Sequence, residues 1–254
     1  MARISKLKGM NTLIASIAVI ASFSIAANAF SGHPAGNTEN QSFSKSKKTL
    51  ELYVYNQLPH ETIYCKGTFE GKEITDPNGF YSDKYKKRAK RLEWEHVVPA
   101  ENFGRAYPAW RNGDAMCITK KGKRYKGRRC ATKVSKDYRY MQADLYNLYP
   151  SIGTVNALRS NYRYGMVEGE SLGNCLMTIQ DRKTEPPNYA KGVVARVALY
   201  FDAVYPKYTL SDSQRQLFNA WDGLYPVTEL ECKRSKIIEG IQGNVNPITS
   251  AGCK

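Results

Sequence analysis

Residues 91–104 read Arg91-Leu92-Glu93-Trp94-Glu95-His96-Val97-Val98-Pro99-Ala100-Glu101-Asn102-Phe103-Gly104, and this stretch decides the fold and the chemistry expected of the chain. Its first half is rich in strand-forming residues, so we predict a strand over 92–98, with Pro99 just beyond its end. His96 is one of only three histidines and directly follows a carboxylate. The unperturbed pKa of histidine, about 6.5, suits a general base at neutral pH.

Hydrolysis of a phosphodiester needs a base, a cation and a donor that orients the phosphate oxygens. His96 is the candidate base, and Glu95 is the nearest carboxylate for a cation such as Mg²⁺, which prefers oxygen ligands. Adjacent residues on a regular strand point to opposite faces, so the two share a site only if the strand ends or twists there. The alternative is that His96 is an ordinary core or surface histidine.

Basic residues surround this stretch. The chain carries 38 Lys and Arg against 23 acidic residues, a net charge of +15, which falls to +12 without residues 1–29. Residues 84–136 hold 17 Lys or Arg and four acids, so this segment carries nearly all of the excess. Charge concentrated in this way predicts a surface that binds the phosphate backbone of a nucleic acid. The candidate contacts are Arg91, Arg105, Arg111, Lys123, Arg124 and Arg129.

Residues 1–29 have the pattern of a secretory signal peptide. Three positive residues precede an apolar run over 13–26, and Ala27-Asn28-Ala29 supplies a small-x-small cleavage motif. A membrane anchor is the alternative, but the apolar run is shorter than the roughly 20 residues of a spanning helix. We therefore expect an exported chain, periplasmic or secreted, with no membrane attachment after cleavage.

The rest of the chain suits a single domain. Residues 30–45, rich in Ser, Gly and Asn, are expected to form a flexible neck before a folded domain over 46–254. Helices are predicted from apolar periodicity and capping patterns at 46–58, 134–148, after Pro187, at 213–224 and after Thr228. Strands are predicted at 62–69, 92–98 and 175–180. The expected class is α+β, with helices outnumbering strands.

The six cysteines are expected to form disulfides, because an even number behind an export signal is typical of an oxidising compartment. None belongs to a Cys-x-x-Cys pair, so the spacing of a zinc ribbon is absent. Six cysteines allow 15 pairings, of which we favour only Cys117 with Cys130, which closes a very basic loop. The six are Cys65, Cys117, Cys130, Cys175, Cys232 and Cys253.

Several motifs, in the same order, resemble those of the bacterial endonuclease I family of exported, nonspecific nucleases. They span roughly residues 92–247. The first is Trp94-Glu95-His96-Val97-Val98-Pro99-Ala100 with Phe103-Gly104, and the second is Asp144-Leu145-Tyr146-Asn147-Leu148-Tyr149-Pro150-Ser151, followed by Gly153, Asn156, Arg159 and Asn161. Further matches are Glu185-Pro186-Pro187, Leu217-Phe218-Asn219-Ala220-Trp221, Tyr225-Pro226-Val227-Thr228 and Gln242-Gly243-Asn244.

The resemblance implies a ββα-metal (His-Me finger) active site embedded in a single, helix-rich α+β domain. It makes His96 the general base and assigns one divalent cation, usually Mg²⁺, to Glu95 and Asn147, with Mn²⁺ or Ca²⁺ able to occupy the same site. Asn147 is carried over from the Asp-x-x-Asn-Leu-x-Pro match, and its other interpretation is a residue that ends the predicted 134–148 helix.

The motif that holds the arginine expected to contact the phosphate differs in this chain. The family has it in a Gly-Gly-Arg stretch soon after a Trp-x-x-Gly segment, whereas here Trp110-Arg111-Asn112-Gly113 is followed by Asp114. Counting back from Cys130 gives Arg128 or Arg129. We prefer Arg128 as the catalytic arginine, with Arg111 as the alternative.

The function expected is that of a metal-dependent, sequence-nonspecific endonuclease, monomeric, that binds the phosphate backbone of DNA, and also of RNA, and leaves 5′-phosphate ends. The alternative is an exported, non-catalytic protein that binds nucleic acid or another polyanion. It explains the charge and the cysteines but not the paired motifs. A zinc hydrolase fits less well, because His-Glu-x-x-His is absent and only His33 and His60 remain as further imidazoles.

Overall fold

The predicted strand at the start of residues 91–104 is present. β3 (Leu92–His96) pairs antiparallel with β4 (Leu148–Ile152), whose residues are all buried. The molecule is described by a computed structural model that covers residues 35–254. The predicted signal peptide and the first part of the predicted neck lie outside the described residues.

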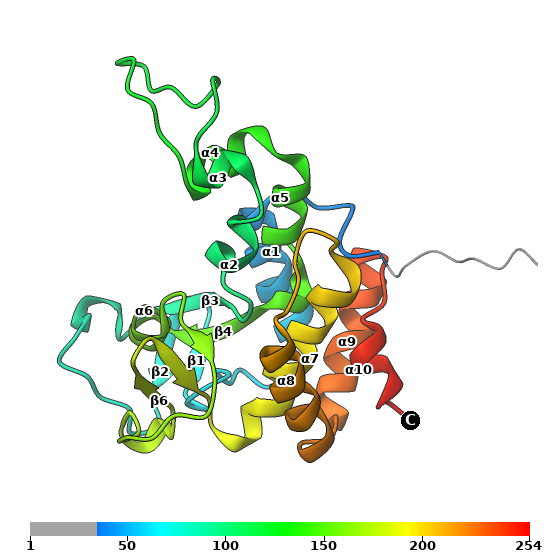
Figure 1. Cartoon of the computed structure of the whole chain (residues 1–254). Helices are drawn as coiled ribbons and strands as arrows, with labels where there is room; N and C mark the ends of the chain where they lie inside the picture. Colours follow the sequence, from blue (N-terminus) through cyan, green and yellow to red (C-terminus); the bar gives the residue numbers. More distant parts are fainter. Residues whose placement is uncertain (1–34) are drawn as a thin grey trace, which may run out of the picture. The chain divides into compact units, whose positions relative to one another are not determined.

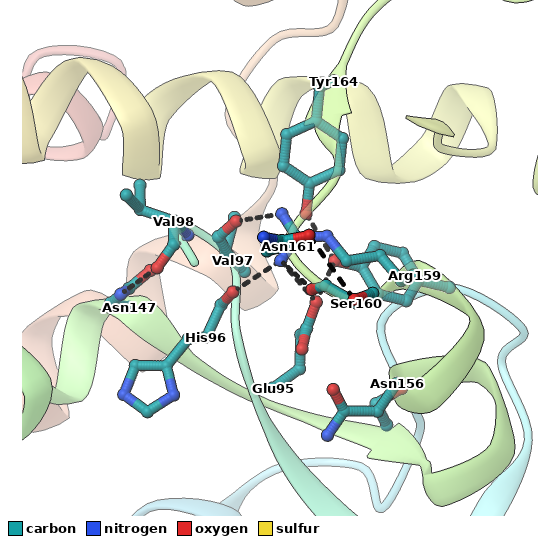
Figure 2. Close-up of polar contacts among 12 residues, drawn as sticks. Glu95, His96, Val97, Val98, Asn147, Asn156, Arg159, Ser160, Asn161 and Tyr164 are labelled. Carbon is teal, nitrogen blue, oxygen red and sulfur yellow. Dashed lines mark hydrogen bonds and ion pairs between the residues drawn. The ribbon is translucent and has the colours of Figure 1, made fainter. Parts of the chain in front are cut away.

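Helix α6 (Gly153–Arg159) follows β4 directly and packs on both strands. Gly153 permits this close approach, because a Cβ atom there would lie 2.7 Å from the carbonyl oxygen of Arg88 and 2.9 Å from Oε1 of Glu93. The first turn of α6 therefore lies against the chain that leads into β3. This β3–β4–α6 unit brings the side chains of β3 together with those of one face of α6 (Figure 2).

Four C-terminal helices lie side by side in Figure 1: α7 (Asn188–Val204), α8 (Asp212–Leu224), α9 (Glu229–Gln242) and α10 (Pro247–Ala251). The first three confirm the predicted helices, and Ser211 and Thr228 cap the second and third through their side chains. The buried guanidinium of Arg196 joins three of the helices, with contacts of 2.6 Å to Glu231 and 2.9 Å to Asp222.

The predicted N-terminal helix is also present. α1 (Phe43–Thr49) continues as a π-helical segment over Leu50–Val54 and a 3-10 turn over Tyr55–Gln57. The flexible neck expected over 30–45 is wrong for the part that the structure describes. Asn37 is buried, and its backbone N–H donates to the hydroxyl of Tyr205 at 2.8 Å. The polar composition of this segment suggested flexibility, because the sequence does not show the hydrogen bonds that it makes with distant residues.

Two further sheets are small. β1 (Thr68–Glu70) and β2 (Glu73–Asp76) form a hairpin, and β5 (Arg163–Tyr164), β7 (Lys183–Glu185) and β6 (Thr178–Gln180) form a sheet in that order. The strand predicted at 62–69 is correct only at its end. Lys66 has a left-handed φ of 52° and the neighbouring Cys65 is bonded to Cys175, so the chain turns there. The strand predicted at 175–180 starts only at Thr178.

The helix predicted over 134–148 is wrong in its second half. The segment consists of the end of α4 (Arg128–Val134), then α5 (Lys136–Gln142), a 3-10 turn over Leu145–Asn147 and the first residue of β4. Asp144 ends the helix, because its buried carboxylate accepts hydrogen bonds from Tyr200 at 2.8 Å and Gln242 at 3.0 Å. The apolar periodicity arose because each of these elements buries its apolar residues.

The basic loop lies between short helices. α2 (Ala100–Gly104) and α3 (Pro108–Arg111) precede it, α4 follows it, and in Figure 1 it extends away from the neighbouring helices. The predicted disulfide between Cys117 and Cys130 is confirmed. The other two disulfides join Cys65 to Cys175 and Cys232 to Cys253, so all six cysteines are paired. The mixed, helix-rich α+β class is confirmed, with short 3-10 turns at Lys86–Arg88 and Gly173–Cys175.

Candidate active site

A cleft of about 590 Å³, here called the catalytic cleft, opens over the β3–β4–α6 unit. Its wall combines side chains from β3, α4 and α6. The charged and polar side chains in this wall include those of Glu93, Glu95, His96, Arg128, Asn156 and Arg159. The structure thus brings together the predicted base, the predicted acidic ligand and the preferred arginine, although Arg128 lies more than thirty positions from the other two in the sequence.

Glu95 presents one free carboxylate oxygen to the catalytic cleft. The side chain is buried, and Oε1 lies 3.1 Å from Nη1 of Arg159 and accepts a hydrogen bond from the hydroxyl of Tyr64 at 3.1 Å. Oε2 has no hydrogen-bond partner among residues 35–254. Burial raises the pKa of this carboxyl group to about 7, although the charge of Arg159 acts in the opposite direction. A bound cation would stabilise the ionised form in this dry environment.

Arg159 holds the end of β3 in place. Its guanidinium is fully buried, and Nη1 and Nη2 donate to the carbonyl oxygens of His96 at 3.0 Å and Val97 at 2.5 Å (Figure 2). The same group pairs with Glu95 and lies over the ring of Tyr164. From the sequence, Arg159 was noted only as part of the matched motif. Its spacing of three from Asn156 on a helix was the available signal, because residues i and i+3 share a face.

His96 is the last residue of β3, and its ring points away from the carboxylate of Glu95 in Figure 2. Both residues nevertheless line the catalytic cleft, because the strand ends at this point. Nε2 lies 2.9 Å from the carbonyl oxygen of Gln142. A carbonyl only accepts, so Nε2 carries the hydrogen and the neutral ring leaves Nδ1 as its basic nitrogen. Burial, and secondarily the charge of Arg128, lower the pKa of His96 to about 3.

Replacing His96 is expected to change how stability depends on acid. The unfolded chain takes up a proton at this residue below its ordinary pKa of about 6.5, whereas the folded protein does so only near 3. The stabilisation that His96 provides is therefore present above pH 6.5 and is lost between these values, by up to about 1.4 kcal/mol per pH unit. Urea unfolding in EDTA at pH 7, 5 and 4 should show that the free energy of unfolding falls less with acid for His96→Gln than for the wild type. Parallel losses in the two proteins would contradict the lowered pKa.

Arg128 lines the catalytic cleft together with His96. Its guanidinium lies 5.1 Å from the ring centre of Phe43, on the wall of the catalytic cleft. Arg129 instead stacks on Tyr125, and Arg111 donates to the carbonyl oxygen of Arg105. Neither of these two lines the catalytic cleft. The geometry therefore favours Arg128, as preferred from the sequence, for contact with a phosphate at this site.

The structure does not place Asn147, the residue assigned from the sequence as the second metal ligand, in the catalytic cleft. Its side chain is fully buried, with Oδ1 accepting from the N–H of Val98 at 2.7 Å and Nδ2 donating to the carbonyl oxygen of Val98 at 3.0 Å (Figure 2). Both polar atoms are thus used to join the start of β4 to the segment after β3. Asn147 does not line the catalytic cleft.

Asn156 is the asparagine of the same motif that lines the catalytic cleft. It lies on α6 and lines the catalytic cleft, and Nδ2 donates to Oε2 of Glu93 at 3.0 Å. This bond directs the amide toward β3, where Glu93 and Glu95 share one face because they are two residues apart. Oδ1 has no hydrogen-bond partner in the part of the chain that the structure describes. Asn156 belongs to the matched motif, but no role was predicted for it from the sequence.

The predicted nucleic-acid contacts are distributed over several surfaces. Lys123 and Arg124 lie in the extended basic loop, and Arg91 is exposed just before β3. None of these three lines the catalytic cleft. Arg105 lines a second cleft beside it. The role of these residues in binding stays a prediction.

Comparison with known proteins gives the family. The model of the family described as Endonuclease I matches residues 26–252. The chain belongs to the endonuclease I family. It is similar to Endonuclease-1 of Buchnera aphidicola subsp. Acyrthosiphon pisum (strain APS), with 39% identity over 81% of this chain and 80% of the relative. It is also similar to two proteins of Aeromonas hydrophila. These are an extracellular deoxyribonuclease (35% identity over 84% of this chain and 91% of the relative) and a periplasmic deoxyribonuclease (35% over 85% and 88%).

As a member of this family the protein is a nonspecific nuclease, and the expectation that it is periplasmic or secreted is confirmed. Within residues 35–254 no helix is long and apolar enough to cross a membrane. The endonuclease I family generally depends on divalent metal ions and acts on nucleic acids.

The donor set of this endonuclease I member suits a hard cation. Among the described residues no group of three or more His, Cys, Asp or Glu lies close enough together to hold a metal ion. His60 contacts the carbonyl oxygen of Tyr55 and the carboxylate of Glu70, outside the catalytic cleft. The free oxygens of Glu95 and Asn156 suit Mg²⁺, which keeps several waters and takes few protein ligands.

Substituting the two asparagines is expected to affect different properties: mainly the stability for Asn147 and mainly the Mg²⁺ dependence of activity for Asn156. Asn147→Ala leaves the N–H and carbonyl of Val98 unpaired, so unfolding should become easier by about 1–3 kcal/mol for each buried group. Asn156→Ala should change stability by less than about 1.5 kcal/mol, since one partly buried hydrogen bond is lost. Activity measured against Mg²⁺ concentration should shift to higher concentration only for Asn156→Ala. A shift for Asn147→Ala in folded protein, with none for Asn156→Ala, would restore the original assignment.

Proposed function

We propose that the protein is a Mg²⁺-dependent endonuclease that hydrolyses DNA, and also RNA, to products with 5′-phosphate ends. The observation that carries this proposal is the convergence of His96, Glu95, Asn156 and Arg128 on one cleft. The names of the relatives, two of them deoxyribonucleases, favour DNA as the substrate. In this proposal the β3–β4–α6 unit is a ββα-metal motif.

His96 acts as the general base of the proposed reaction. Its neutral imidazole takes a proton from the attacking water at Nδ1, while the Nε2–H donates to the carbonyl oxygen of Gln142 and fixes the ring. The lowered pKa keeps the ring neutral over the whole neutral range. Arg128, on the same cleft, donates to the non-bridging oxygens of the scissile phosphate.

Glu95 and Asn156 would hold the cation, with Mn²⁺ and Ca²⁺ as other ions that the same oxygens accept. When bound, it supplies positive charge that stabilises the negative charge developing on the phosphate and the leaving oxygen. Arg159 contributes by fixing Oε1 of Glu95, so that Oε2 remains directed to the catalytic cleft. Glu93 orients Asn156 in the same way, through the hydrogen bond to its Nδ2.

A plasmid-nicking assay tests the proposal. The oxidised protein is incubated with supercoiled plasmid in MgCl₂, in EDTA, and in EDTA followed by excess MgCl₂. Nicking only when Mg²⁺ is present is expected, and a labelled RNA tests the second substrate. Products should accept a kinase label at the 5′ end only after phosphatase treatment. Binding of plasmid without nicking under all three conditions would favour the non-catalytic alternative.

A further inference from the structure

A second cleft of about 690 Å³ lies beside the catalytic cleft. The two share Glu101 and Asn161 in their walls. Nδ2 of Asn161 donates to Oε2 of Glu101 at 2.6 Å, so this pair forms a common rim. A linear polymer that extends from the catalytic cleft over this rim enters the second cleft directly.

The second cleft is positively charged. Its wall contains four basic side chains, those of Arg105, Arg163, Arg182 and Lys207, and one acidic side chain, that of Glu101. Glu101 is already neutralised, because it pairs with Arg105. The side chains of Arg163 and Arg182 are exposed and make no ion pair or hydrogen bond with any residue from 35 to 254. They therefore have their charge and donors available for an external anion.

The small sheet places these two arginines close together. In β5, Arg163 pairs with Lys183 of β7, and Arg182 immediately precedes Lys183 in the turn between β6 and β7. Arg182 and its neighbour Asp181 both have left-handed φ values, 60° and 49°, in this two-residue turn. Such turns favour Asn or Gly, so an arginine at this position has a conformational cost. The sheet thus presents two guanidinium groups to the second cleft from a fixed base.

We propose that this second cleft, named the Arg163–Arg182 cleft, binds the phosphate backbone of the nucleic acid beyond the scissile bond. Guanidinium groups suit phosphate oxygens because their donors form a planar fork. The hydroxyl groups of Thr209 and Ser211 in the same wall offer further donors. The inference rests on the proposed nuclease function. The binding site that it adds is only partly formed by the basic segment 84–136. Three of its basic residues, Arg163, Arg182 and Lys207, lie outside that segment.

The test is the salt dependence of binding by R163A/R182A. Affinities for a labelled single strand and a labelled duplex are measured by fluorescence anisotropy at several NaCl concentrations, in EDTA to prevent cleavage. Loss of two phosphate contacts should reduce the slope of log K against log [NaCl] by about 1.4 for the single strand and about 1.8 for the duplex. The matched control is K233A/K236A, which removes two exposed lysines of α9 that line neither cleft. Its slope should equal that of the wild type.

Strand length separates the two clefts. R163A/R182A should weaken binding of a long strand but not of a tetranucleotide confined to the catalytic cleft. R163K/R182K, which keeps both charges, should recover most of the salt slope. Unchanged slopes for R163A/R182A, or equal losses on short and long strands, would overturn the proposal. Because these measurements need no catalysis, they are independent of the plasmid assay that tests the proposed nuclease function.

Discussion

His96→Ala is expected to lower the rate of plasmid cleavage in Mg²⁺ by about 10²–10⁴-fold, the contribution that a positioned general base typically makes. The reason is that Nδ1 of His96 is the free nitrogen of a neutral imidazole on the wall of the catalytic cleft, with Nε2 already engaged by Gln142. The initial rate of nicking at saturating Mg²⁺ measures the effect. Binding of DNA in EDTA should stay within a few-fold of the wild type, since no phosphate contact is removed.

The matched control is His60→Ala, which removes a histidine that hydrogen-bonds Tyr55 and pairs with Glu70 outside the catalytic cleft. It should cleave plasmid at close to the wild-type rate. Thermal unfolding of both variants establishes that they are folded. A folded His96→Ala protein with activity within about tenfold of the wild type would show that another group acts as the base.

Arg159→Met is expected to destabilise the fold by about 3–5 kcal/mol, the usual cost of removing one partner of a buried ion pair. The substitution leaves the carboxylate of Glu95 without its counter-charge and the carbonyl oxygens of His96 and Val97 without donors. Because Arg159 fixes the carboxylate of Glu95, a proposed metal ligand, the apparent affinity for Mg²⁺ should fall as well. Urea unfolding of the oxidised protein in EDTA measures the stability, and activity against Mg²⁺ concentration measures the second effect.

A double-mutant cycle isolates the pair. Glu95→Gln removes the charge that Arg159→Met leaves unpaired, so the double variant E95Q/R159M should be more stable than R159M alone. Arg159→Lys keeps the charge but lacks the planar fork, and we expect an intermediate stability. Additive effects in the cycle, or an Arg159→Met protein as stable as the wild type, would show that Arg159 does not hold Glu95 in place.

Local chemistry made much of this protein predictable. The helices α7, α8 and α9 follow from apolar stripes and from the capping side chains of Ser211 and Thr228, all of which act within a few residues. β3 follows from its strand-forming residues, and its end at His96 lets Glu95 and His96 share a cleft. The disulfide between Cys117 and Cys130 could be predicted from the sequence because it closes a short loop.

Local chemistry could not predict which of two asparagines lines the catalytic cleft and is the candidate metal ligand. Asn147 and Asn156 lie nine positions apart in one matched motif, and as two asparagines they suit a cation equally well by residue type. Only the passage from β4 into α6 decides that Asn156 faces the catalytic cleft while Asn147 is used on Val98. The apolar periodicity misled the helix prediction over 134–148, because Asp144 finds its partners Tyr200 and Gln242 in distant helices.

Residues close together in the sequence were therefore enough to predict the family, the α+β class, the export and the candidate pair Glu95–His96, because caps, periodicity and contiguous motifs act over short distances along the chain. The tertiary structure alone decided the second metal-ligand candidate, the anchoring of residues 35–45, and the place of Arg159. It also decided that Arg163 and Arg182 meet in one cleft. Each of these depends on contacts between residues far apart in the sequence, whose partners are chosen by the packing of β3, β4 and α6 with the rest of the fold.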